Sequence, residues 1–150
     1  MIAFRSILVP TDFGDCSAPA VRYAAMLAEK FGAELILLHV IQDTAMVMPD
    51  AVMPAPVSVP DLNQLLDAGK MGLAHLIDRE NLAALNPRVE VRVGSPVAEI
   101  VAAATDLKAD LLCIGTHGRT GLAHLLLGSQ AERIIREAPC PVLTVKAGTA

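Results

Sequence analysis

Tryptophan is absent from this chain of 150 residues, and aromatic residues make up only 3% of it. Few rings are therefore available to stack on unpaired bases, which is how many proteins hold single-stranded nucleic acid. The formal net charge is -4, and no long run of lysine and arginine occurs. These two features argue against nucleic acid as the main partner.

Cysteine is scarce as well, and none of the three cysteines lies in a Cys-x-x-Cys pair. An odd count without pairing argues against a disulfide framework and fits a reducing compartment. Cys113 lies within an apolar run and is expected to be a small buried hydrophobe. No apolar run approaches the roughly 20 residues that span a bilayer, and the apolar run at residues 7–9 is too short for a signal peptide. The expectation is a cytoplasmic protein.

Several motifs of nucleotide chemistry and catalysis are missing. The chain has neither a P-loop nor a Gly-x-Gly-x-x-Gly dinucleotide fingerprint, and it has no Gly-x-Ser-x-Gly nucleophile motif. His117 and His124 are seven residues apart, with no third ligand spaced for zinc. No general base for attacking water is evident. The chain is therefore expected to be no enzyme, or at most a weak ATPase.

Hydrophobic residues make up 53% of the chain, which is enough for one aliphatic core, so residues 1–150 are expected to form a single domain. Apolar runs and helical spacings alternate along the chain. This pattern predicts an α/β domain with an open, five-stranded parallel sheet and helices on both faces. The predicted strands cover residues 6–9, 34–40, 88–93, 111–114 and 141–146, and the predicted helices cover residues 17–31, 61–85, 97–106 and 131–137.

Residues 42–60 interrupt this alternation. Four prolines and three methionines fall in this stretch, and prolines at such density break both helix and strand. A long loop is therefore predicted, and loops of this length tend to be functional. The loop is either a plain connector or a lid or partner-contact arm, for which methionine is a suitable adaptable side chain.

Glycines cluster where the fourth strand gives way to the fourth helix, at Gly115, Gly118 and Gly128. Glycine lets an anion approach backbone N–H groups closely, and a helix N-terminus carries partial positive charge. Ser129 stands three residues before Glu132, which is a capping-box pattern. A tight strand-to-helix connection without a ligand is the alternative reading of the same glycines.

The spacing Gly-x2-Gly-x9-Gly-Ser, from Gly115 to Ser129, resembles the nucleotide-binding signature of the universal stress protein family, in its ATP-binding branch. The flanking residues agree, and the resemblance runs from residue 7 to residue 145. It implies a Rossmann-like sheet with strand order 3-2-1-4-5. In that order the chain reverses direction between strands one and four, and ligands bind at such a switch point.

The predicted ligand site has a phosphate end and a base end. Backbone N–H groups of Gly118 and residues 128–130 would hold phosphates, helped by the Ser129 hydroxyl and Arg119. Asp12 is expected at the ribose or base end, or as a ligand of Mg²⁺, although capping the first helix is its structural alternative. The resemblance alone assigns the backbone of Val40 to adenine. The full predicted set is Pro10, Thr11, Asp12, Val40, Gly115, Thr116, His117, Gly118, Arg119, Gly128, Ser129 and Gln130.

The resemblance implies an ATP-binding universal stress protein, a nucleotide-dependent regulator with slow or no hydrolysis. A non-nucleotide-binding dimer of the same fold, with a signalling or structural role, is the alternative. An adenylyl-transfer enzyme has less support, since no His-x-Gly-His follows the first strand.

The last strand is expected to form a homodimer. Its residues carry no charge before Lys146, and an uncharged sheet edge is a template for pairing with another chain. Two copies related by a twofold axis would bury the same patch, Val142, Leu143, Thr144 and Val145. The family resemblance implies the same interface.

Overall fold

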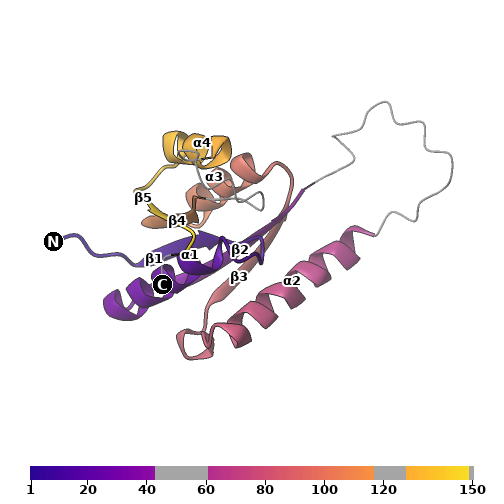
Figure 1. Ribbon diagram of the computed structural model, residues 1–150, viewed down its shortest axis with the longest axis horizontal. Coiled ribbons are helices and arrows are strands. Elements are labelled where there is room, and N and C mark those ends of the chain that lie inside the picture. The colour runs from indigo at the N-terminus through magenta and orange to yellow at the C-terminus, as the bar shows by residue number, and fades with distance from the viewer. Residues whose placement is uncertain (43–60, 117–127, 149–150) are drawn as a thin grey trace.

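A computed structural model describes residues 1–42, 61–116 and 128–148 (Figure 1). Most of the predicted loop, from residue 43 to residue 60, lies outside the described residues. The elements, in chain order, are β1 (Ser6–Pro10), α1 (Ala18–Phe31), β2 (Glu34–Ile41), α2 (Leu62–Arg79), the short 3-10 helix η2 (Ala83–Leu85), β3 (Arg88–Val93), α3 (Pro96–Asp106), β4 (Leu111–Gly115), α4 (Ser129–Glu137) and β5 (Val142–Val145).

The five strands form one sheet in the order β3-β2-β1-β4-β5, and every neighbouring pair is parallel. The predicted fold class and strand order are therefore confirmed. The central strands β1, β2 and β4 are apolar on both faces, as strands covered by helices on both sides must be. The edge strand β3 alternates charged and apolar residues, and its side chains are partly exposed.

Two separate apolar cores lie on the two faces of the sheet. Ile7 and Val9 of β1 point to the face covered by α1 and α2, whereas Leu8 points to the face covered by α3 and α4. Figure 1 shows the same arrangement, with α3 and α4 above the sheet and α1 and α2 below it. The alternation of side chains along a strand is what supplies both cores from one short apolar run.

The helix predicted over residues 61–85 is shorter than expected. α2 ends at Arg79, and the chain then turns through Asn81, which has a left-handed backbone with φ 56°. Glu80 is bound to α1 at this point, because the guanidinium of Arg22 in α1 donates two hydrogen bonds to its carboxylate, at 2.7 and 3.3 Å. The helical spacing of Leu82 was misleading, since this side chain reaches the core from the turn.

The predicted burial of Cys113 is confirmed. Its side chain is fully buried in β4, and this burial raises the pKa of the thiol to about 12. The thiol therefore stays protonated at neutral pH and behaves as a small apolar side chain. Among the described residues, no helix combines the length and apolarity that a bilayer crossing requires.

The directions that the chain takes after the two central strands position the site. β1 continues into α1 on one face of the sheet, and β4 leads toward α4 on the other. The helices that follow β1 and β4, α1 and α4, therefore lie on opposite faces of the sheet, and a crevice lies between their starts.

Candidate functional site

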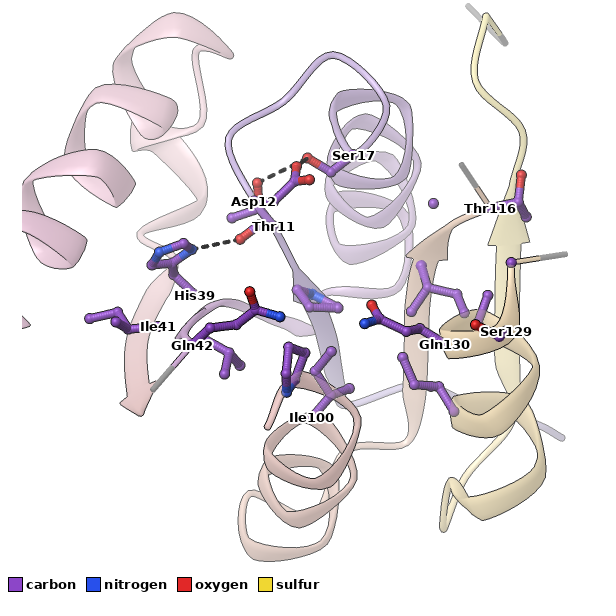
Figure 2. Close-up of a pocket in the computed structure, with 18 residues that line it drawn as sticks. Thr11, Asp12, Ser17, His39, Ile41, Gln42, Ile100, Thr116, Ser129 and Gln130 are labelled. Carbon is purple, nitrogen blue, oxygen red and sulfur yellow. Dashed lines mark hydrogen bonds between the residues drawn. The ribbon is translucent and has the colours of Figure 1, made fainter. Parts of the chain in front are cut away.

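A cavity of about 690 Å³ lies beyond the carboxyl ends of β1, β2 and β4 (Figure 2). Its volume is in the range typical of small-molecule and cofactor sites. Apolar side chains from β4, α3 and α4, among them Ile100, Ile114 and Ile134, line part of it. Polar groups come from three segments: the turn after β1, the end of β2 and the start of α4.

The turn after β1 carries Thr11, Asp12 and Ser17, which are tied together by hydrogen bonds. The Asp12 carboxylate accepts from the backbone N–H of Gly14 at 2.9 Å and from the Ser17 hydroxyl at 3.0 Å. The Ser17 and Thr11 hydroxyls lie 3.2 Å apart. The carboxylate therefore braces its own turn, and Ser17, the residue before α1, makes no side-chain cap for the helix. Figure 2 shows these three side chains gathered on one side of the cavity.

The end of β2 forms the second wall, with His39, Val40, Ile41 and Gln42. The His39 ring nitrogen Nδ1 lies 2.9 Å from the carbonyl oxygen of Thr11. Since a carbonyl only accepts, Nδ1 carries the proton and donates it. This bond joins the second wall to the turn after β1.

The start of α4 forms the third wall. Gly128 is the N-cap and Ser129 is the first helical residue, so the predicted capping box is wrong. Glu132 does not reach back to the N-terminus, because its carboxylate accepts from Arg136 one turn later at 2.9 Å. Gly128 has no side chain to cap the helix. The first N–H groups of α4 thus lie at the cavity wall, as an anion site needs.

Two glycines at the cavity have different structural roles. A Cβ on Gly115 would lie 2.6 Å from the carbonyl oxygen of Cys16, so only glycine lets β4 approach the start of α1 so closely. Among the described residues, the nearest atom to a Cβ on Gly128 would be the Thr116 carbonyl oxygen at 3.9 Å. Gly115 is therefore required by packing, whereas a side chain at Gly128 would have room among the described residues.

Metal-ligating groups are sparse. The described residues hold no cluster of three or more His, Cys, Asp or Glu side chains that could bind a metal ion. Asp12 is the one carboxylate among the described lining residues. A single carboxylate fits Mg²⁺ only where other ligands, such as phosphate oxygens, arrive with the ion.

The structure brings together most of the residues predicted from the sequence. Those that line the cavity are Pro10, Thr11, Asp12, Val40, Gly115, Thr116, Gly128, Ser129 and Gln130. His117, Gly118 and Arg119 lie outside the described residues. The carboxamides of Gln42 and Gln130 extend into the cavity from opposite walls (Figure 2).

The sequence reasoning missed several lining residues. His39 and Ile41 flank Val40 at the end of β2, and Gln42 follows that strand directly, so nearness to a strand end was an available signal. Ser17, five residues after Asp12, lies just before α1. The apolar contributors Pro96 and Ile100 from α3 had no such signal. Their place depends on how the crossover from β3 to β4 passes over the sheet, which the local sequence does not encode.

The family model described as "Universal stress protein family" matches residues 3–146. This chain belongs to the universal stress protein family. The universal stress protein MJ0531 of Methanocaldococcus jannaschii is 38% identical over 144 residues, which cover 95% of this chain and 82% of that protein. The universal stress protein MT1672 of Mycobacterium tuberculosis is 33% identical, with 97% and 98% of the two chains covered.

Solved structures of the family have the same fold. The structure of protein MJ0577 from M. jannaschii superposes with a TM-score of 0.77 at 29% identity, covering 99% of this chain and all of that one. A universal stress protein crystallised in complex with cAMP gives a TM-score of 0.69 at 27% identity, covering 98% of this chain and 100% of that one. A family member with a bound cyclic nucleotide thus shares this architecture.

The different roles of the two glycines predict different effects of alanine on stability. Gly115→Ala should destabilise the fold by about 1–3 kcal/mol, because the new methyl group forces the start of α1 away from β4. Gly128→Ala should change the free energy of unfolding by less than about 0.5 kcal/mol. Urea unfolding followed by circular dichroism measures both values. Equal stabilities of the two variants would contradict the assignment of Gly115 to packing.

Proposed function

We propose that this universal stress protein binds ATP in the cavity beyond β1 and β4 and acts as a nucleotide-dependent regulator. The observation that carries the proposal is the start of α4 at the cavity. Its first backbone N–H groups have no side-chain cap from the described residues, and no described atom would lie nearer than 3.9 Å to a Cβ on Gly128. A helix N-terminus next to free volume is a favourable place for phosphate. The cAMP complex of a related family member supports the choice of an adenine nucleotide.

The base and ribose lie at the opposite side in this proposal, against the end of β2 and the turn after β1. Val40 would offer its backbone N–H and C=O to the edge of adenine. Asp12 would accept hydrogen bonds from the ribose hydroxyls, since a carboxylate next to phosphates would repel them. The alternative role for Asp12 is as a ligand of Mg²⁺, whose charge would offset the repulsion between this carboxylate and the phosphate oxygens that complete the coordination.

Slow or no hydrolysis is part of the proposal. Asp12 and His39 are the titratable side chains among the described lining residues. The Asp12 carboxylate accepts two hydrogen bonds from its own turn, and His39 donates to the Thr11 carbonyl. General-base catalysis needs a group within hydrogen-bond reach of the attacking water. Because both groups are engaged in structure, binding and regulation fit the site better than turnover.

The phosphate end is tested by Gly128→Val. The isopropyl group would fill the space beside the first N–H groups of α4, so ATP binding should weaken by more than about tenfold, or about 1.4 kcal/mol. Isothermal titration calorimetry measures the affinity. Ala74→Val, at an exposed position on α2, is the matched control and should bind ATP like the parent.

A Gly128→Val protein that binds ATP as tightly as the parent would show that the phosphates lie elsewhere. A parent protein that binds no ATP at all would favour the alternative, a dimeric family member without a nucleotide.

We further propose that the regulator is a homodimer joined through β5. The β5 strand is an edge of the sheet, next to β4 only. The carbonyls of Pro141 and Val145 accept from the backbone N–H groups of Leu112 in β4 and of Thr116 just beyond it, at 3.0 and 3.1 Å. Since backbone groups alternate along a strand, Val142 and Thr144 direct theirs away from β4 and toward a partner.

Proline scanning distinguishes the two sides of β5. Thr144→Pro removes an outward donor and should convert the dimer to monomers while the fold stays intact. Leu143→Pro removes a group that faces β4 and should instead lower the stability of the fold. Light scattering gives the mass in solution. A parent protein that is monomeric at micromolar concentration, or a dimer that survives Thr144→Pro, would refute this interface.

A further inference from the structure

Phe13 follows Asp12 in the turn after β1 and has an unusual backbone. Its φ is 65°, in the left-handed region that residues other than glycine rarely adopt. Such a conformation persists only where the surrounding structure holds it. The Phe13 side chain is half-buried and packs against the core on the α1 and α2 face of the sheet. The packing of this ring therefore holds the turn that carries Asp12.

Helix α2 forms one side of the slot that holds this ring. A Cβ on Gly72 would lie 2.6 Å from Cζ of Phe13, 2.9 Å from Cε2 and 3.2 Å from Cε1. Glycine is among the least favourable residues in a helix interior. Its presence at position 72 is explained by the ring, since any larger residue would push Phe13 out of its place.

His39 forms the other side of the slot. The Phe13 and His39 rings are tilted by 34°, with their centroids 4.3 Å apart. His39 also donates to the Thr11 carbonyl, and the Phe13 backbone N–H donates to the Thr11 hydroxyl at 3.0 Å. The ring, the imidazole and the turn therefore form one closed set of contacts. The dashed line from His39 to Thr11 in Figure 2 is one hydrogen bond of this set, and both of these residues line the cavity.

We propose that Phe13, seated between Gly72 and His39, is a positioning residue that holds Thr11 and Asp12 in place for the ligand. The inference rests on the proposed function, because it assigns Asp12 to the ribose and base end of a nucleotide. Phe13 itself is not among the residues that line the cavity. Its effect on binding passes through the turn, where small displacements of a polar group cost affinity.

The proposal is tested by filling the slot from the helix side. Gly72→Ala displaces the ring and should weaken ATP binding by about tenfold, in keeping with the cost of overpacking a tight contact. Inorganic triphosphate, which occupies only the α4 end, should bind each variant like the parent. Competition calorimetry measures both ligands.

Gly69→Ala is the matched control on the same helix. A Cβ there would meet Cγ1 of Val91 at 2.9 Å, so it also disturbs the packing of α2, but its nearest His39 atom is at an ordinary 3.6 Å. ATP affinity of this variant should stay within about twofold of the parent. Equal losses in the Gly69 and Gly72 variants would assign the effect to movement of the whole helix and overturn the proposal.

Rescue separates positioning from general damage. Leucine lacks the Cε and Cζ atoms that the Gly72→Ala methyl group would meet, so Phe13→Leu should restore ATP binding in the Gly72→Ala protein. The two changes should therefore be strongly non-additive. A folded Gly72→Ala protein that binds ATP like the parent, or a loss that Phe13→Leu does not repair, overturns the proposal. If Gly72→Ala fails to fold, Phe13→Ala empties the slot instead and should weaken ATP binding similarly.

A measurement without ligand keeps this inference separate from the proposed function. The Gly14 backbone N–H is bonded to the Asp12 carboxylate at 2.9 Å, so its hydrogen exchange reports on the turn directly. Gly72→Ala should accelerate this exchange and Gly69→Ala should not. Unchanged exchange in Gly72→Ala overturns the anchoring role. If Gly72→Ala accelerates the exchange but the parent protein binds no ATP, the anchoring role of Phe13 stands and the proposed nucleotide binding is wrong.

Discussion

The pairing of β1 with β4 at the centre of the sheet is the contact on which the rest of the molecule depends. The two strands are about a hundred residues apart in the chain, yet Ile7 pairs with Leu111 and Leu8 with Leu112. Each strand sends the following chain to a different face of the sheet, so the crevice between them is a consequence of topology. Both apolar cores draw on these strands, since Leu8 and Leu112 lie in one core and Ile7 and Leu111 in the other.

Close backbone approaches then shape the crevice. Gly115 lets the end of β4 lie against Cys16, and at Gly128 the described residues leave room beside the start of α4. The turn after β1 is held by its own hydrogen bonds and by His39, which belongs to the neighbouring strand. The polar groups of the cavity are thus supported from behind by rigid strands and helices. Such support is what an ordered binding site requires, because the groups need no rearrangement to meet a ligand.

The family resemblance predicted the strand order, whereas strong local signals predicted the strands themselves and much of the half of the cavity lining that was anticipated. Short apolar runs that end at Pro10 or at Gly115 indicate buried strands. The glycines between the fourth strand and the fourth helix indicate the position of the cavity. Sequence reasoning failed at Ser129 and at the end of α2. In both places a side chain bonds to a partner that the local pattern does not indicate. Glu132 accepts from Arg136 instead of capping α4, and Glu80 accepts from Arg22 of α1 where α2 ends. The slot between Gly72 and Phe13 was equally invisible, since it joins residues about sixty positions apart.

Titrating the isotope-labelled parent protein with ATP while recording backbone amide NMR spectra tests whether one ligand spans the crevice from the end of β2 to the start of α4. A nucleotide in this position should cause saturable shifts at residues 11–12, 40–42, 116 and 129–130 together, with one common affinity. The amides of Arg88 and Val89, which pair with Ile36 and Leu37 at the end of β3 away from the cavity, should stay unchanged. Shifts confined to one of these segments, shifts centred on another surface, or no shifts at all would contradict a nucleotide in this cavity.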